Sequence, residues 1–128
     1  MRLLLDTQVF LWSIAEPERL SPAARKAIED GANAVFVSAA SAWEIAIKVG
    51  LGRLKIPGDP VRFVPDQIAR NAFQPLSIIV EHALAVQALA DHHRDPFDRL
   101  LVAQAGAERL AIVSADRALR AYDVRVIW

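Results

Sequence analysis

Residues 2–15 read RLLLDTQVFLWSIA, a short apolar run that meets one acid and continues directly into a helical pattern. The run at 3–5 has no polar face, which is typical of a strand covered on both sides of a parallel sheet. Asp6 follows at once, and ligands of open α/β sheets bind beyond the carboxyl ends of the strands. The segment therefore predicts a buried first strand with an acid at the functional edge of the sheet.

The same alternation continues along the chain. Further strand-length apolar runs lie at residues 35–37, 78–80, 110–113 and 124–127. Helical patterns are predicted over residues 7–15, 22–30, 42–49, 60–72, 81–92 and 96–108, the last with Asp95 as its N-cap. Strands that alternate with helices of this length indicate βαβ units. We expect an α/β fold, a three-layer α/β/α sandwich around a parallel sheet.

Composition limits the class of protein. The 128 residues have the length of one domain, and we expect a single domain over 1–128. Basic and acidic side chains number 15 each, so zero net charge excludes a whole-surface electrostatic grip on nucleic acid or anionic membrane. The absence of cysteine excludes disulfides and thiolate chemistry. No uncharged apolar stretch reaches the roughly 18 residues of a membrane span, so we expect a cytoplasmic protein.

Four acids occupy comparable places in this pattern. Asp6 and Asp116 follow apolar runs, whereas Glu44 and Asp98 lie in the first turns of predicted helices. All four are expected on or beside the carboxyl edge of one sheet. Each also has a structural explanation: Asp6, Asp98 and Asp116 suit helix starts. The segment SAWE at 41–44 matches a capping box, in which Glu44 reaches back to the Ser41 amide.

Together, the four carboxylates indicate a cation. Carboxylates about 4–6 Å apart repel one another by about 3–4 kcal/mol per pair at an effective dielectric near 20. A fold that gathers four of them therefore needs a compensating charge. Oxygen ligands without cysteine or an obvious histidine favour Mg²⁺ or Mn²⁺ over zinc. Such ions activate water and stabilise charge on a phosphoryl group.

Four segments carry a resemblance to a known family. They are LLLDTQVFLW at 3–12, VSAASAWEIAIKVGLGRL at 37–54, HHRDPFDRLLVAQA at 92–105 and AIVSADRALRAYDVRVIW at 111–128. In this order they resemble the PIN-domain ribonucleases, and more narrowly the VapC-type toxins of toxin–antitoxin pairs. The resemblance implies a five-stranded parallel sheet in the order 3-2-1-4-5. It also implies an Mg²⁺- or Mn²⁺-dependent endoribonuclease that hydrolyses RNA and inhibits translation or growth when free of its antitoxin.

The resemblance also implies partners and site residues. A homodimer and a cognate VapB-type antitoxin that reaches the acidic pocket are expected. The family's first to fourth acids correspond to Asp6, Glu44, Asp98 and Asp116, which would bind one or two metal ions and carry catalysis. Asp95 competes with Asp98 for the third role. Asp98 is preferred because it leads directly into an apolar helix, whereas Asp95 followed by proline makes a good helix start.

Basic side chains offer possible contacts to RNA. Residues 48–70 hold five basic and two acidic side chains, a net charge of +3, which suits either an RNA backbone or a solvated face. Arg94 and Arg99 flank the third acid, where they could bind phosphate or pair with the carboxylates. Pairing is the preferred interpretation.

Histidines and tryptophans are given structural explanations. The spacing of His82, His92 and His93 matches no common zinc motif, so surface or core positions are expected. Trp12 and Trp43 lie among apolar neighbours and are expected in the core or at an interface rather than stacked on bases.

Other functions fit less well. A haloacid-dehalogenase phosphatase needs a second acid two residues after Asp6, and the sequence has glutamine there. A response-regulator receiver needs a late lysine, whereas the last lysine is Lys55. A catalytically silent protein- or RNA-binding module remains the main alternative, and a DNA nuclease is also open because the metal chemistry does not select the sugar.

Overall fold

Five parallel strands form the central sheet of the structure, a computed structural model that describes residues 1–128. They are β1 (Arg2–Leu5), β2 (Ala34–Ser38), β3 (Gln74–Leu76), β4 (Ala111–Val113) and β5 (Val126–Ile127). The strand order is β3-β2-β1-β4-β5, which confirms the order that the family resemblance implied. Leu5 is in register with Val37 and with Val113. Strands β1, β2 and β4 therefore end at one level, and the residues that follow them share one edge.

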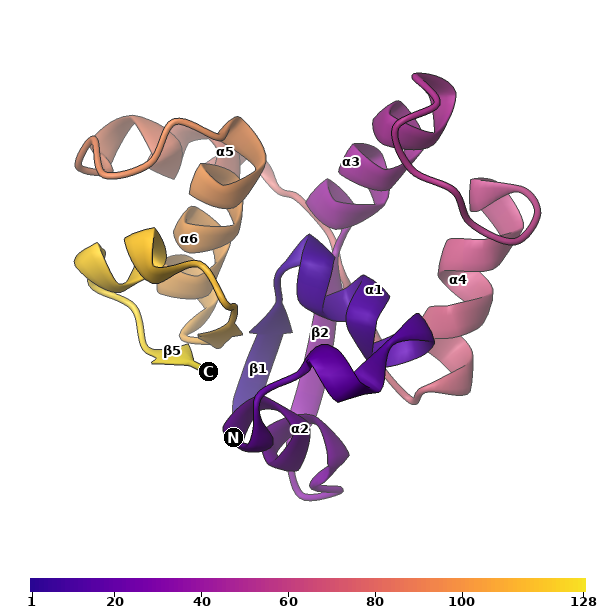
Figure 1. Ribbon diagram of the computed structural model, residues 1–128. Helices are drawn as coiled ribbons and strands as arrows, with labels where there is room; N and C mark the ends of the chain where they lie inside the picture. The colour runs from indigo at the N-terminus through magenta and orange to yellow at the C-terminus, as the bar shows by residue number, and fades with distance from the viewer.

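Helices cover both faces of this sheet (Figure 1). They are α1 (Thr7–Ala15), α2 (Pro22–Glu29), α3 (Ala39–Gly50), α4 (Pro60–Arg70), α5 (Val80–Ala85) and α6 (Pro96–Glu108), with 3-10 turns η1 (Pro17–Arg19), η2 (Val86–Ala88) and η3 (Arg117–Ala121). Leu3 and Leu5 pack with Phe10 of α1 in one core cluster. Leu4 packs with Leu101 of α6 in the other. Alternate residues of β1 thus face opposite helical layers, which confirms the predicted three-layer sandwich.

Helix α3 begins three residues earlier than the predicted capping box requires. The Ser38 hydroxyl caps it by accepting the Ala40 amide hydrogen at 3.0 Å. Ser41 is therefore inside the helix, where its Oγ accepts a hydrogen bond from Thr7 Oγ1 at 2.9 Å. The capping-box interpretation of Glu44 is wrong, because strand β2 continues into α3 without a loop. Glu44 lies in the second turn, where its side chain serves no helix terminus.

The third strand lies at Gln74–Leu76 and not at the predicted 78–80. Strand β3 pairs only with β2, so it is an edge strand, where Pro75 costs no ladder hydrogen bond. The apolar run at 78–80 instead leads into α5, and Ile79 and Val80 are 46 % and 69 % exposed. Hydrophobicity selected the wrong segment because an exposed edge strand needs few apolar residues.

The remaining predicted boundaries differ by smaller amounts. The predicted helices 7–15 and 96–108 agree with α1 and α6 at both ends. The helix predicted over 60–72 ends at Arg70, and the one over 81–92 is replaced by α5 and the short turn η2. Among these helices, none combines the length and apolar character that a membrane crossing requires.

Candidate active site and metal centre

A cleft with a volume of about 480 Å³ lies at the carboxyl edge of the sheet. The four predicted site acids line it together: Asp6, Glu44, Asp98 and Asp116. Asp95 is a fifth carboxylate in its wall, and Lys48 and Arg53 are its basic side chains. The structure thus places all the predicted acids around one space, with more acidic than basic groups facing it.

Asp6 is held at the junction of β1 and α1. Its Oδ1 accepts the Val9 amide hydrogen at 2.7 Å and thereby caps α1. The side chain is almost fully buried, with 7 % exposure of the residue. Burial raises the pKa of Asp6, opposed by hydrogen bonds from Ser114 and Val9 and reinforced by the charge of Asp116. The local structure therefore holds the Asp6 carboxyl at a buried position where its ionised form is destabilised.

Glu44 has a built-in counter-charge. Lys48 Nζ donates a hydrogen bond to Glu44 Oε2 at 2.6 Å, one helical turn further along α3. That hydrogen bond raises the pKa of Lys48 above its ordinary value. The Glu44 side chain is 9 % exposed and that of Lys48 48 %, so the ammonium covers the carboxylate from the solvent side.

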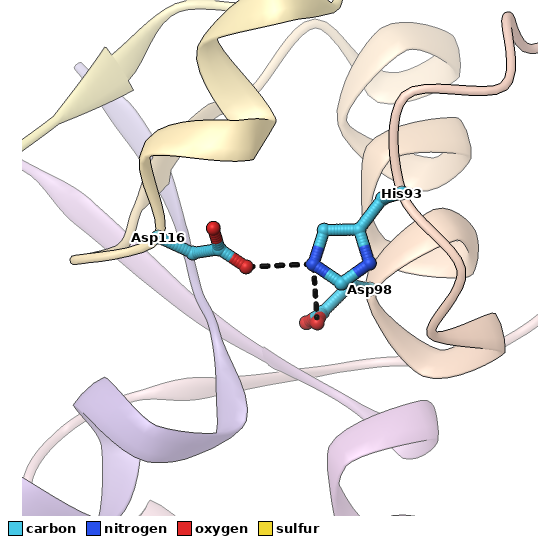
Figure 2. A group of neighbouring side chains, drawn as sticks. All are labelled: His93, Asp98 and Asp116. Carbon is cyan, nitrogen blue, oxygen red and sulfur yellow. Dashed lines mark hydrogen bonds and ion pairs between the residues drawn. The ribbon is translucent and has the colours of Figure 1, made fainter.

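His93 lies between two carboxylates (Figure 2). Its Nε2 is 2.6 Å from Asp116 Oδ2 and 3.3 Å from Asp98 Oδ2. One potential ligand atom from each of the three residues lies within 4.8 Å of the others. His93 is thus half-buried against two of the predicted site acids, and the expectation that it is not a metal ligand stays a prediction. The only feature of the sequence that pointed to this contact is that His93 lies two residues before Asp95, the N-cap of the helix that carries Asp98.

Asp98 is the carboxylate of the cleft whose ionised form is least favourable. Burial raises its pKa to about 7, and the charge of Asp95 acts in the same direction, while His93 lowers it. The charges of Asp6 and Glu44 raise it further. A carboxyl with these surroundings is stabilised when a cation enters, because the cation offsets the repulsion that keeps the proton bound.

Asp95 performs the capping role that the sequence predicted. Its Oδ1 accepts amide hydrogens from Phe97 at 2.8 Å and from Asp98 at 3.4 Å at the start of α6. The cap occupies one of its oxygens, whereas no helix amide engages the Asp98 carboxylate in this way. Both acids line the cleft, so the assignment of the third acidic role to Asp98 stays a prediction.

Arg99 does not pair with the carboxylates, so that prediction is wrong. Its guanidinium donates to the backbone carbonyls of Ala90 at 3.0 Å and Val86 at 3.2 Å, and to the Tyr122 hydroxyl at 3.2 Å. These contacts tie α6 to η2, to the segment that follows η2, and to Tyr122 directly after η3. Arg99 is not among the residues that line the cleft.

The other two histidines and the tryptophans have mixed outcomes. His82 is buried, and its Nε2 is 2.8 Å from Glu108 Oε1, while His92 is exposed beside Tyr122, so both structural expectations are confirmed. Trp12 packs against Trp128 with ring centroids 5.9 Å apart. Trp43 is 58 % exposed and is not part of the core.

The raised pKa of Asp98 makes the stability of the metal-free protein depend on pH. This pKa is about 7 in the folded state against an ordinary 3.8, so between these values the folded protein binds a proton that the unfolded chain releases. Lowering the pH from about 8 to about 6 is therefore expected to raise the melting temperature measured in EDTA. Asp98→Asn should lose most of this rise, whereas Asp66→Asn on α4 should keep it. An unchanged rise in Asp98→Asn would assign it to another group.

Comparisons with known proteins agree with this architecture. The family model described as PIN domain matches residues 3–125. Ribonuclease VapC22 of Mycobacterium tuberculosis (strain ATCC 25618 / H37Rv) is 36 % identical over 120 residues, which are 93 % of this chain and 90 % of that protein. Ribonuclease VapC16 of the same organism is 46 % identical over 59 residues, 46 % of this chain and 40 % of that protein.

Solved structures share the fold at lower identity. The complex VapBC2 from Rickettsia felis, bound to a DNA fragment from its promoter, contains a chain with a TM-score of 0.71 at 13 % identity, covering 98 % of this chain and 97 % of that one. A chain of FitAB bound to a DNA fragment has a TM-score of 0.62 at 21 % identity, covering 97 % and 92 %. Because the family model spans nearly all of the sequence, this chain belongs to the PIN-domain family.

Proposed function

We propose that this protein is a metal-dependent endoribonuclease that hydrolyses RNA phosphodiester bonds as the toxin of a toxin–antitoxin pair. The observation that carries the proposal is the convergence of four carboxylates in one cleft of a PIN-domain chain: Asp6, Glu44, Asp98 and Asp116. Ribonuclease VapC22, which matches 93 % of the chain, supports RNA as substrate. The toxin–antitoxin pair is supported by the likeness to a chain of the VapBC2 complex.

The four acids would bind one or two divalent cations, Mg²⁺ or Mn²⁺. When bound, such an ion lowers the pKa of a coordinated water and stabilises negative charge on a phosphoryl oxygen. The donor set fits, because carboxylate oxygens suit these hard cations better than they suit zinc. The pKa of about 7 at Asp98 also fits, since burial and then the charge of Asp95 raise it, and a cation would offset both.

The chain holds these acids at fixed separations. The Thr7–Ser41 hydrogen bond of 2.9 Å joins α1 to α3, and thus the elements that carry Asp6 and Glu44. Such pre-positioning lowers the entropic cost of arranging water and phosphate for in-line attack. Lys48 and Arg53 lie in the cleft wall, where they would contact phosphate oxygens of the RNA backbone.

Cleavage of total cellular RNA by the purified, antitoxin-free protein tests the proposal. Discrete cuts are expected with Mn²⁺ or Mg²⁺ and none with EDTA. Cleavage that continues in EDTA would contradict a metal-dependent mechanism. The silent-module alternative predicts neither cleavage nor metal binding, so a parallel Mn²⁺ titration by calorimetry separates the two.

Glu44→Gln is expected to weaken Mn²⁺ binding by about tenfold or more, because it removes one anionic ligand from the cleft. The melting temperature should change little, since Glu44 caps no helix end. Calorimetric titration measures the affinity. The matched control is Glu81→Gln, an exposed glutamate on α5 whose loss should leave the affinity unchanged. An affinity equal to that of the parent protein would remove Glu44 from the ligand set.

Partners follow from the same proposal. A cognate VapB-type antitoxin would block the cleft, and a homodimer is the expected assembly, both acting in the cytoplasm. Co-expression with a candidate VapB-type antitoxin, followed by size-exclusion chromatography with light scattering, measures both the complex and the state of the free toxin. A free toxin that runs as a monomer at micromolar concentration would contradict the dimer.

A further inference from the structure

His93 directly contacts two of the four site acids, Asp98 and Asp116. Its Nε2 lies 2.6 Å from Asp116 Oδ2 and 3.3 Å from Asp98 Oδ2, and its side chain is only 17 % exposed. A nitrogen between two carboxylates is either a metal ligand or a hydrogen-bond donor. These two roles require opposite protonation of Nε2, so the other ring nitrogen decides between them.

The backbone settles where the ring proton is. The Asp95 amide hydrogen is donated to His93 Nδ1 at 3.0 Å. An amide N–H can only donate, so Nδ1 must present its lone pair and carries no hydrogen. The proton of the ring is therefore on Nε2, which faces two carboxylate oxygens that can only accept when ionised. The hydrogen bond between Nε2 and Asp116 agrees with this tautomer, and Asp98 Oδ2 lies 3.3 Å from the same nitrogen (Figure 2).

The arrangement is the reverse of a ligating histidine. Histidines that bind a metal through one nitrogen almost always donate the other ring N–H to a carboxylate or carbonyl. Here the other nitrogen accepts, so coordination through Nε2 would require the proton to move to Nδ1. That move would place two hydrogens face to face and break the contact with the Asp95 amide, next to the cap that starts α6.

We propose that His93 is not a metal ligand but a positioning residue, whose Nε2–H bridges Asp98 and Asp116 in the metal-free site. The inference rests on the proposed function, in which these two acids bind the cation. The bridging hydrogen offsets part of their repulsion and keeps the two oxygens close. An entering cation competes with the Nε2–H for the same oxygens.

Two kinds of variant separate a bridge from a ligand. Removing a competing donor should leave Mn²⁺ binding at least as tight, and we expect His93→Ala to tighten it about threefold or more. His93→Gln retains an N–H donor of similar reach and should return the affinity toward that of the parent protein. His92→Ala, in the exposed preceding histidine, is the matched control and should leave the affinity unchanged. A tenfold weaker affinity in His93→Ala would overturn the proposal and make the residue a ligand.

Long-range ¹H–¹⁵N NMR correlation reads the tautomer directly in the full-length protein. A protonated Nε2 and an unprotonated Nδ1 are expected for His93 in EDTA at about pH 8. The proton should stay on Nε2 at saturating Mg²⁺, which is diamagnetic. A proton on Nδ1 in either spectrum would overturn the proposal. If the parent protein binds neither Mg²⁺ nor Mn²⁺, the proposed function fails, and the EDTA spectrum alone decides whether His93 is the bridge.

Discussion

Asp6→Asn is expected to lower the rate of RNA cleavage by at least about a hundredfold while the protein still folds. Asparagine has nearly the same shape, and its carbonyl oxygen can accept the Val9 amide hydrogen that caps α1. The change therefore removes the charge and retains the cap. Because burial raises the pKa of Asp6, the charged side chain is unfavourable in the metal-free fold, and the melting temperature in EDTA should not fall.

The measurement is single-turnover cleavage of a sequenced target RNA, together with thermal unfolding in EDTA. Asp66→Asn is the matched control, since Asp66 is half-exposed on α4 and pairs only with Arg70 at 2.9 Å. That control should cleave at the parental rate. Cleavage by Asp6→Asn at the parental rate would mean that the metal-site assignment is wrong, whereas loss of folding in the same variant would show that the charge itself supports α1.

Gln104→Ala is expected to destabilise the protein by about 2–4 kcal/mol. Gln104 is fully buried in α6, where its Oε1 accepts the Ser38 hydroxyl hydrogen at 2.5 Å and its Nε2 donates to the Ser77 carbonyl at 3.3 Å. Alanine leaves the buried Ser38 hydroxyl without this acceptor, removes the hydrogen bond to the carbonyl of the exposed Ser77, and opens a cavity in α6. The hydrogen bonds also join α6 to the start of α3, so the acids on these two helices should lose their fixed separation.

Urea unfolding monitored by circular dichroism measures this loss as a lower midpoint at a similar slope. Gln87→Ala in η2 provides the control, because Gln87 is exposed. Its truncation should change the free energy of unfolding by less than about 0.5 kcal/mol and so leave the midpoint almost unchanged. An unchanged midpoint in Gln104→Ala would show that water or neighbouring groups replace the amide. This prediction holds whether or not the protein cleaves RNA.

Local signals predicted the alternation of strands and helices and the acids beyond the strands, whereas the strand order came from the family resemblance. The unbroken apolar run before Asp6 and the pairing of Asp95 with Pro96 gave two helix starts that agree with the structure. The carboxyl-edge rule for parallel sheets then placed Asp6 and Asp116 at one edge of the sheet. Each helix start was predicted from residues that are adjacent in the chain, because hydrophobic periodicity and helix capping depend on adjacent residues.

The features that sequence reasoning missed depend on contacts between distant segments. Ser38 and Ser41 are equivalent as candidate caps until the end of β2 is known, and β3 is an exposed edge that hydrophobicity does not mark. Arg99 binds backbone carbonyls, which no residue type reveals in advance. Likewise, His93 contacts Asp116 from 23 residues away in the chain, so its place beside this acid follows only from the fold.

The two outer strands also limit how copies of this chain can associate. Strand β3 has three residues, one of them Pro75, and β5 has only two, so neither edge offers a continuous row of free amides and carbonyls. Joining two sheets edge to edge into one larger sheet needs such a row. Edge strands that are short or contain proline protect a protein against edge-to-edge strand pairing and aggregation. Any stable assembly must therefore form through side chains of the helical layers, whose sequence can vary without disturbing the sheet.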